Sequence, residues 1–246
     1  MSYVEWIRSR VGRQKIFLVY ATVVLRDENG RILCQQRTDF AWWGLPGGVL
    51  ELNESIEQCA RRELREETGF EVGDLRLVGV YTHPKWDVTY PNGDEVQQWT
   101  VCFTGQVAGG TAVVDEAEVR SQAFFTPDEA QQLTMPCWYR AMLADTLAEK
   151  RPTFTPPFRK PELVDQIWSV RPKIGCEWLI GVGAMSVVQD GAGRVLLIQR
   201  RDLGKWIFPA GYSAIGENVA QTAVRETQEE TSILSQPERI LAIYSS

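Results

Sequence analysis

The chain has 246 residues, a formal net charge of −6, 44% hydrophobic residues and 24% charged residues. This is the balance of an ordinary globular protein, so it excludes a disordered chain, a collagen-like repeat and a small disulfide scaffold. An acidic chain also lacks the basic surface that binds a nucleic acid polymer, whereas a small anionic substrate remains compatible with it.

We expect no targeting signal at the start of the given sequence. Residues 1–13 are charged and contain no apolar core, so we expect no signal peptide. The apolar run 16–25 is far shorter than the roughly 20 residues that cross a bilayer, so we expect no membrane partner. The five cysteines have no CxxC spacing, which is typical of free thiols and favours a cytoplasmic protein. The single histidine, His83, excludes a Ser/His/Asp triad and a histidine-based zinc site.

The first predicted element is a β-hairpin. Residues 17–25 are apolar and β-rich, and residues 31–36 read Arg-Ile-Leu-Cys-Gln-Gln. The turn sequence Asp-Glu-Asn-Gly at 27–30 lies between them. We therefore expect the two segments to pair as antiparallel neighbours.

A helix is predicted next, over residues 55–68. Ser55 and Gln58 have the spacing of a capping box, and Gly69 suits the left-handed position that ends a helix. Beyond it the pattern predicts three strands and a second helical region that is interrupted by a proline. The predicted strands are 75–81, 97–107 and 121–125, and the predicted helical region is 127–149.

The chain then repeats itself. Residues 30–70 align without a gap on 193–233, a shift of 193 − 30 = 163 positions, and 17 of the 41 aligned residues are identical. Unrelated segments would share only about two or three at ordinary residue frequencies. We therefore expect a first domain over 1–150, a proline-rich linker over 151–163 and a truncated second copy over 164–246.

Three carboxylates share one face of the predicted helix. Glu63, Glu66 and Glu67 are spaced i, i+3 and i+4, so their charges repel one another unless something compensates. An isolated stripe of this kind is usually a solvated surface, but a glycine-rich loop precedes this one and the whole arrangement recurs. The recurrence favours a site for a hard cation such as Mg²⁺ or Mn²⁺. The metal candidates of the second copy are Glu226, Glu229 and Glu230.

Residues 48–70 resemble a complete Nudix box. They read Gly48-x5-Glu54-x7-Arg62-Glu63-Leu64-x-Glu66-Glu67-x-Gly69-Phe70, which fills every position of GX5EX7REUXEEXGU, where U is apolar. The resemblance covers residues 1 to about 145 and, as a partial copy, 164–246. It implies an α+β fold, namely a Nudix-like α/β/α sandwich with a mixed sheet, followed by a partial second Nudix-like copy.

The resemblance also implies an enzyme. The expected reaction is hydrolysis of a nucleoside diphosphate linked to a group X, such as ADP-ribose, a nucleotide sugar or a dinucleotide, by attack of water at phosphorus. The expected cofactor is Mg²⁺ or Mn²⁺, and the expected partner is a small nucleotide. The expected metal ligands are Glu63, Glu66 and Glu67, with a carbonyl of Gly48.

Other site residues are less directly indicated by the box. Glu54 and Arg62 are expected to orient the loop and the helix. The general base is left open between a box glutamate and the acidic run 115–118, in which Glu118 is favoured over Glu116. The residues expected to contact the substrate are Trp86, Tyr90 and Arg37.

The second copy departs from the box pattern at Thr227 and Ser232. It also has no counterpart of residues 84–150 in this chain, so we expect exposed strand edges and an exposed apolar face. Three interpretations stay open. This copy packs on the first copy or on a partner chain, giving a possible homodimer; it is completed by strands of another subunit and is active; or it is partly disordered.

Three alternative functions compete with the leading hypothesis. The first is a (d)NTP pyrophosphohydrolase that clears damaged or excess nucleotides, which the box does not distinguish. The second is a nucleotide-sensing Nudix module without turnover, and the undamaged box of the first copy argues against it. The third is an isoprenoid-isomerase relative, for which the required cysteine context is missing.

Overall fold

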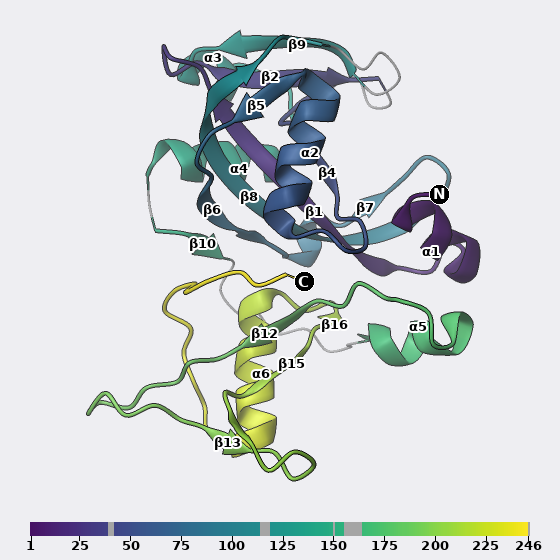
Figure 1. Cartoon of the computed structure of the whole chain (residues 1–246), viewed down its shortest axis with the longest axis vertical. Helices are drawn as coiled ribbons and strands as arrows, with labels where there is room; N and C mark the ends of the chain where they lie inside the picture. The colour runs from purple at the N-terminus through teal and green to yellow at the C-terminus, as the bar shows by residue number, and fades with distance from the viewer. Residues whose placement is uncertain (39–41, 114–118, 150, 155–163, 246) are drawn as a thin grey trace.

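The computed structural model describes residues 1–38, 42–113, 119–149, 151–154 and 164–245. Figure 1 shows the first copy above the second, with the C-terminal segment passing between them. The helices of the first copy are α1 (Tyr3–Val11), α2 (Ile56–Thr68), α3 (Pro127–Gln132) and α4 (Cys137–Leu147), with a 3-10 turn η1 at Pro84–Trp86. Its strands are β1 (Ile16–Arg26), β2 (Ile32–Arg37), β3 (Trp43–Gly44), β4 (Gly47–Val49), β5 (Phe70–Val72), β6 (Arg76–Tyr81), β7 (Val88–Thr89), β8 (Glu95–Gly110), β9 (Val119–Phe125) and β10 (Thr153–Phe154).

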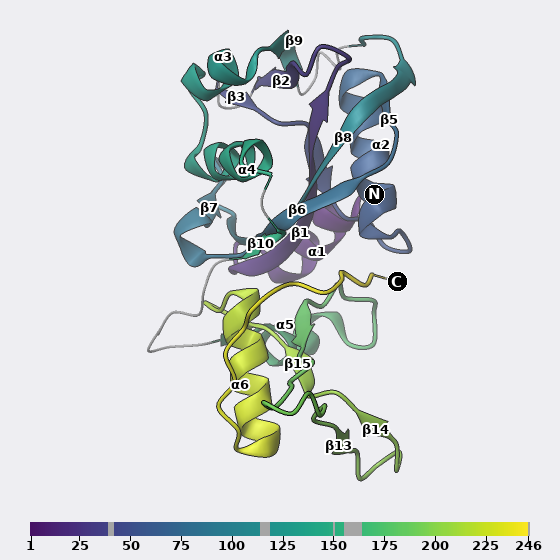
Figure 2. The ribbon, with the colours of Figure 1, turned by 90° about the vertical axis from the view of Figure 1, so that its left-hand side faces the viewer.

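These strands form one mixed sheet between two helical layers. Its central order is β10-β6-β8-β1-β2-β3, and β4, β5, β7 and β9 pair at the sides. Strands β1 and β8 run parallel from Ile16 opposite Val96 to Arg26 opposite Gln106. Helix α2 lies on one side of the sheet and α4 on the other (Figure 2). The expected α/β/α sandwich with a mixed sheet is therefore confirmed.

Strand β1 is central because it is apolar on both faces. Val23 and Leu25 contribute to the hydrophobic cluster under α2, while Val24 contributes to the cluster under α3 and α4. A strand covered on both sides needs a nearly continuous apolar sequence, which residues 16–25 supply.

The predicted hairpin is only partly correct. Its turn forms, since the Asp27 amide donates to the Arg31 carbonyl and the Gly30 amide to the Asp27 carbonyl. However, β1 and β2 pair only at Arg26 opposite Ile32. The strands diverge because β4 pairs with β1 and places Gly47 opposite Thr22, while β2 pairs with β3 and β9.

The remaining predicted elements of the first copy agree with the structure, and one of its helices was not foreseen. The helix at 55–68, the strands at 75–81, 97–107 and 121–125 and the interruption at Pro136 are all present. Helix α1 was not predicted from the sequence. None of the helices in the described ranges is long and apolar enough to cross a bilayer.

The second copy has counterparts of α1 and α2 but only fragments of the sheet. Its helices are α5 (Gln166–Ile174) and α6 (Val219–Thr231), and its strands are β11 (Val164–Asp165), β12 (Gly183–Met185), β13 (Ile198–Gln199), β14 (Trp206–Ile207), β15 (Ala210–Tyr212) and β16 (Ala214–Ile215). Val187 is 42% exposed, whereas the equivalent Val24 is 0% exposed. The expected exposed apolar face is therefore present in the described residues, because no counterpart of β8 lies beside this segment. Residues 155–163, most of the predicted linker, lie outside the described residues.

Candidate active site

Two glycines bring strand β4 against its neighbours. Gly47 has φ of +149°, and a Cβ there would clash with the backbone of β1 at Ala21. A Cβ on Gly48 would clash with the carboxyl group of Glu63. Both positions therefore require glycine. Gly47 allows close approach of the β1 backbone, and Gly48 allows close approach of the Glu63 carboxylate.

Helix α2 begins and ends as its sequence predicts. The Ser55 hydroxyl accepts from the Gln58 amide, the Gln58 side chain accepts from the Ser55 amide, and Gly69 ends the helix with φ of +75°. Leu64 and Cys59 are buried against the sheet. The side of the helix that carries Arg62 and Glu66 is thereby directed away from the core, while Glu67 is buried.

Arg62 joins three carboxylates of the box. Its guanidinium makes two hydrogen bonds with Glu54, at 3.0 and 2.5 Å, and single bonds with Glu63 at 2.7 Å and Glu66 at 3.1 Å. It also donates to the carbonyl of Val49 in β4. The pKa of Arg62 is raised above its usual value, mainly by the hydrogen bonds to Glu54 and also by the hydrogen bonds to Glu63 and Glu66. Arg62 and Glu54 thus tie the helix to the loop, the geometry expected of orienting residues.

Glu67 is a buried acid, only 4% exposed. Its carboxylate accepts from the Gly47 amide and from the Gln35 side chain, each at 2.8 Å. Burial nevertheless raises the pKa of Glu67 to about 7, since these hydrogen bonds do not offset the loss of solvation. A carboxylate in such surroundings is favoured by a nearby cation.

A cavity of about 270 Å³ opens beside these carboxylates. Glu63, Glu67 and both glycines of β4 line one part of it. The opposite walls are aromatic and polar and include Tyr20, Arg37, Trp42, Tyr90, Gln98 and Tyr139. Carboxylates, one guanidinium and several rings therefore face the same space, which is the composition expected for a metal ion, a phosphate and a base.

The predicted site residues do not all lie in the cavity. Glu63, Glu67, Gly48, Arg37 and Tyr90 line the cavity. Glu66 is exposed on α2 beside Arg62. Among the described residues no group of three or more His, Cys, Asp and Glu side chains is gathered closely enough to hold a metal. Glu63 and Glu66 both form ion pairs with Arg62.

Two predicted residues need separate comment. Trp86 was expected in an exposed loop but is 7% exposed and packs beside Tyr81 in the core; it does not line the cavity. The reason is that η1 folds this segment onto the sheet, where the carbonyl of Trp86 accepts from Gln98. Glu118 and the rest of the acidic run 115–118 lie outside the described residues.

Several residues of the site were missed by the sequence reasoning. Gln35 holds Glu67, while Tyr20 and Tyr139 line the cavity, and the Tyr20 and Tyr90 hydroxyls lie 3.1 Å apart. A glutamine within an apolar buried strand was the one available signal, because such a side chain needs a polar partner. Tyr139 gave no signal, since it approaches only through the packing of α4.

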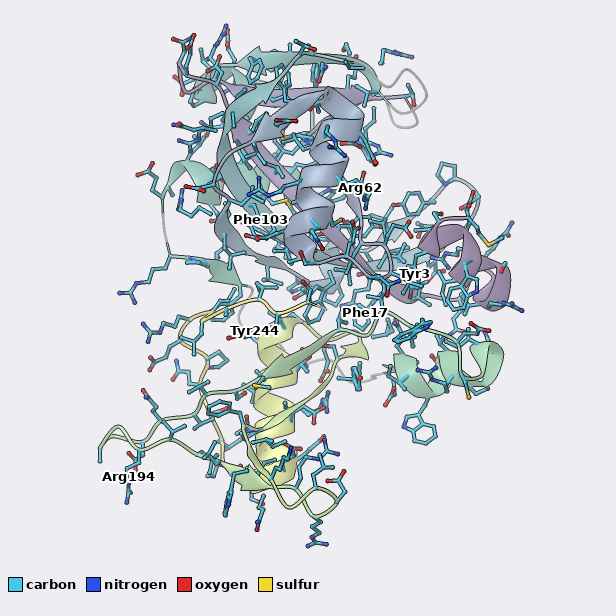
Figure 3. All side chains as sticks on the ribbon, in the orientation of Figure 1. Tyr3, Phe17, Arg62, Phe103, Arg194 and Tyr244 are labelled. Atoms are coloured by element: carbon cyan, nitrogen blue, oxygen red, sulfur yellow. The ribbon has the colours of Figure 1, made fainter. Side chains whose placement is uncertain are left out.

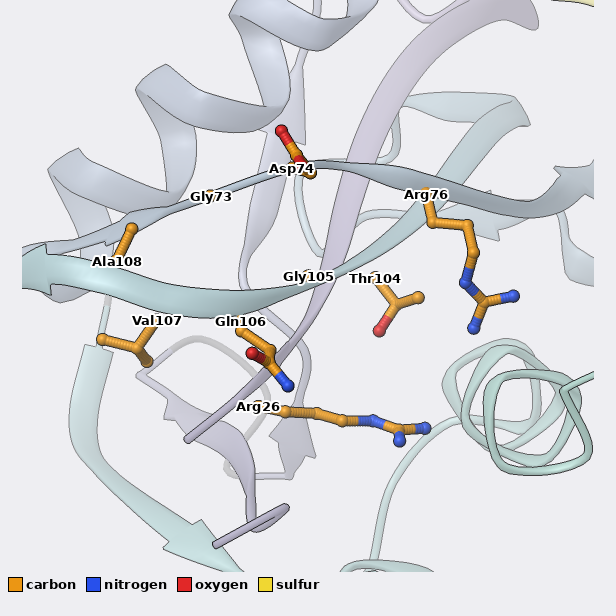
Figure 4. Close-up of a pocket in the computed structure, with 9 residues that line it drawn as sticks. All are labelled: Arg26, Gly73, Asp74, Arg76, Thr104, Gly105, Gln106, Val107 and Ala108. Carbon is orange, nitrogen blue, oxygen red and sulfur yellow. The ribbon is translucent and has the colours of Figure 1, made fainter. Parts of the chain in front are cut away.

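A second cavity, of about 470 Å³, lies elsewhere in the first copy (Figure 4). It is lined by Arg26, Asp74, Arg76 and Gln106 among others, and none of the box residues contributes to it. Its larger size is therefore not a reason to prefer it over the cavity beside the carboxylates.

The box geometry recurs in the second copy. Arg225 bonds to Glu217 at 2.6 Å, Glu226 at 2.7 Å and Glu229 at 3.2 Å. The Ala210 amide donates to Glu230 as Gly47 does to Glu67. The two departures are accommodated, since Thr227 bonds to the Ala223 carbonyl and Ser232 adopts φ of +61°. The cavity walls do not recur, because Tyr90, Gln98 and Tyr139 have no counterpart in this chain.

Comparison with known proteins identifies the fold family. The NUDIX domain family model matches residues 17–146 and 179–246, which is most of the chain and includes both copies. The chain belongs to the Nudix family. Nudix hydrolases are pyrophosphohydrolases that use divalent metal ions and act on small nucleotide substrates, so this protein is a Nudix hydrolase in that general sense.

Individual relatives differ in what their names describe. A Bacillus subtilis (strain 168) protein named as a candidate 8-oxo-dGTP diphosphatase is 33% identical over 116 residues, 47% of this chain and 71% of that protein. The NAD-capped RNA hydrolase NudC of Vibrio atlanticus (strain LGP32) is 32% identical over 104 residues, 42% of this chain and 35% of that protein. The solved structure of a NUDIX hydrolase from Nitrosomonas europaea is 25% identical in sequence. The match covers 56% of this chain and 93% of that chain, with a TM-score of 0.46.

Proposed function

We propose that the first copy, residues 1–150, hydrolyses the diphosphate linkage of a nucleoside diphosphate linked to X, with Mg²⁺ or Mn²⁺ as the cofactor. The observation that carries this proposal is the cavity in which Glu63 and Glu67 face Arg37 and an aromatic wall. Carboxylate oxygens suit these hard cations, and the raised pKa of the buried Glu67 shows that burial disfavours its ionised form, which a bound cation would stabilise.

Each residue then has a distinct task. Glu63, Glu66 and Glu67 would hold the metal, with the Gly48 carbonyl as a further ligand. When bound, the metal would supply positive charge for the phosphate oxygens and acidity for a water molecule. Arg62 and Glu54 fix the position of the loop before α2 relative to the helix.

The remaining roles concern the substrate and the base. Arg37 neutralises a phosphate group at the cavity wall, and Tyr90 stacks on the base or ribose. We assign the general base to Glu118, with Glu66 and Glu63 as the box alternatives. The second copy supplies Glu226, Glu229 and Glu230 as metal ligands but no substrate walls, so it is inactive.

A second candidate substrate class is the (d)NTPs. It is favoured by one observation, the similarity to the Bacillus subtilis protein whose name refers to 8-oxo-dGTP. The second product distinguishes the two classes, because a (d)NTP yields a nucleoside monophosphate and pyrophosphate, whereas an NDP-X yields a nucleoside monophosphate and the phosphorylated group X.

The test is turnover on a panel of ADP-ribose, nucleotide sugars, dinucleotides and (d)NTPs with Mg²⁺ or Mn²⁺. The variant Glu66→Gln/Glu67→Gln is compared with the matched variant Glu229→Gln/Glu230→Gln. We expect only the first pair to lose activity, by about 1,000-fold or more, since metal charge stabilisation is worth several kcal/mol. Equal loss in both variants would contradict the assignment of activity to the first copy. Binding of a nucleotide without any turnover would favour the sensing function.

A further inference from the structure

The two copies meet through equivalent surfaces. Helices α1 and α5 occupy equivalent positions, since 3 + 163 = 166 and 11 + 163 = 174, and they contact each other. Ile7 and Val11 of α1 share one buried cluster with Val170 and Ile174 of α5, which are their own counterparts. An interface in which the same surface serves both partners is the type found in twofold symmetric dimers.

Hydrogen bonds between the copies are also reciprocal. The Ile180 amide donates to the Tyr3 hydroxyl at 3.3 Å. The Phe17 amide donates to the Gln166 side chain. Positions 17 and 180 are equivalent, and so are 3 and 166, so each copy makes the same bond to the other. Figure 3 shows Tyr3 and Phe17 at the boundary between the copies.

A second reciprocal pair involves the box helices themselves. The amide of Ile56, the first residue of α2, donates to the Ser245 hydroxyl at 2.8 Å. The amide of Val219, the first residue of α6, donates to the Thr82 hydroxyl at 3.0 Å. Because 56 + 163 = 219 and 82 + 163 = 245, these are again the same bond in both directions. Each copy therefore satisfies one of the free amides at the start of the other copy's box helix.

The interface is built from buried polar groups. Gln97 is completely buried; its side chain donates to the Glu217 carbonyl at 2.7 Å and accepts from the Gly216 amide at 2.6 Å. Thr82 and Gln166 are buried as well. Buried polar groups with directional partners fix one relative orientation, because any other orientation would leave them unsatisfied.

This interface continues into the candidate active site. The amide of Tyr3 donates to the Glu51 side chain at 2.8 Å, and the amide of Glu51 donates to Glu54 at 2.8 Å. Glu54 in turn holds Arg62. Helix α1 thus contacts the second copy through the Tyr3 hydroxyl and the box loop through the Tyr3 amide.

We propose that the second copy is a tethered partner that positions the active site of the first through a twofold-like interface, with Ser245 as a positioning residue at the start of α2. The loop 51–55 is held by α1 on one side and by the Ser245 contact on the other, and this fixes the positions of the carboxylates of α2. The catalytic part of this inference rests on the proposed function, whereas the interface does not.

The test uses amide hydrogen exchange in the full chain. Ser245→Ala removes the acceptor for Ile56, and we expect exchange at Ile56 to become about 5- to 10-fold faster while Val219 is unchanged. Thr82→Val is the matched control, because it preserves the side-chain shape and removes the acceptor for Val219. In Thr82→Val we expect faster exchange at Val219 and unchanged exchange at Ile56. Unchanged exchange at Ile56 in Ser245→Ala, or the same acceleration at both amides in both variants, would overturn the proposal.

Turnover then separates positioning from mere stability. We expect kcat to fall about 3-fold in Ser245→Ala with KM unchanged, to recover in Ser245→Thr, and to stay at the parent value in Thr82→Val. An unaltered kcat in Ser245→Ala alongside faster exchange at Ile56 would overturn the positioning role. If the parent protein turns over no substrate, the proposed function fails while the exchange pattern still decides the interface.

Discussion

Single side chains set the geometry of the site at positions where no larger group fits. Gly48 is the clearest case, because a Cβ there occupies the place of the Glu63 carboxyl group. The same relation holds between Gly211 and Glu226 in the second copy. A glycine is required at these positions for the space it leaves to a carboxylate, and not for an unusual backbone angle.

Gly48→Ala is therefore expected to displace Glu63 and to lower kcat/KM by about 100-fold while the protein remains folded. The control is Gly73→Ala, where a new Cβ would have no neighbour nearer than 3.7 Å. Steady-state kinetics and circular dichroism of both variants provide the measurement. Parent-like kinetics of Gly48→Ala would show that Glu63 is not needed in its present position.

The turn at Asp27 leads to a prediction about pH. Desolvation opposes ionisation of Asp27, but hydrogen bonds from Arg31 and Asn29 outweigh it and hold the pKa below its ordinary value. A lowered folded pKa stabilises the fold above the ordinary carboxylate pKa of about 3.9, and this contribution is lost as the pH falls through the folded value. Asp27→Asn should therefore lower the free energy of unfolding by about 0.5 kcal/mol at pH 7, and the difference should vanish in acid. Urea unfolding at pH 7 and at successively lower acidic pH tests this, with the more exposed Asp190→Asn as the matched control; a difference that does not shrink as the pH falls would contradict it.

At the scale of elements, helix α2 is determined by its own ends as well as by its core. The capping box at Ser55 and the left-handed Gly69 were both predictable, because they depend on residues within a few positions. Strand pairing was less predictable. The β1 and β2 segments were correctly recognised as strands, but their partners are β4, β8 and β9, which the local pattern does not specify.

Ser55→Ala should destabilise the start of α2 by about 1 kcal/mol, because the Gln58 amide loses its acceptor. Ser55→Asp should restore most of the loss, since a carboxylate at the N-cap also accepts that bond. Urea midpoints of the three proteins measure the effect. If Ser55→Ala matches the parent, the capping box contributes nothing and burial of α2 alone defines the helix.

At the scale of the whole molecule, the chain is one Nudix unit with complete cavity walls joined to a second that has the box alone. We expect removal of divalent ions with a chelator to reduce turnover by at least about 100-fold, and Mg²⁺ or Mn²⁺ to restore it. The same titration in Glu229→Gln/Glu230→Gln should restore activity at the same metal concentration. Turnover that persists in the chelator would contradict the metal assignment of Glu63, Glu66 and Glu67.

The sequence by itself determined the box, the repeat, the family and the helix that carries the carboxylates, because each depends on local spacing or on comparison of the chain with itself. Tertiary structure alone decided which side chains form the cavity. Tyr139 and Gln35 approach the carboxylates from α4 and β2, while Trp86 turns into the core. The reciprocal contacts between the copies likewise join residues such as Ile56 and Ser245 that are 189 positions apart. Such proximity follows from the packing of the sheet and helices, and sequence spacing carries no record of it.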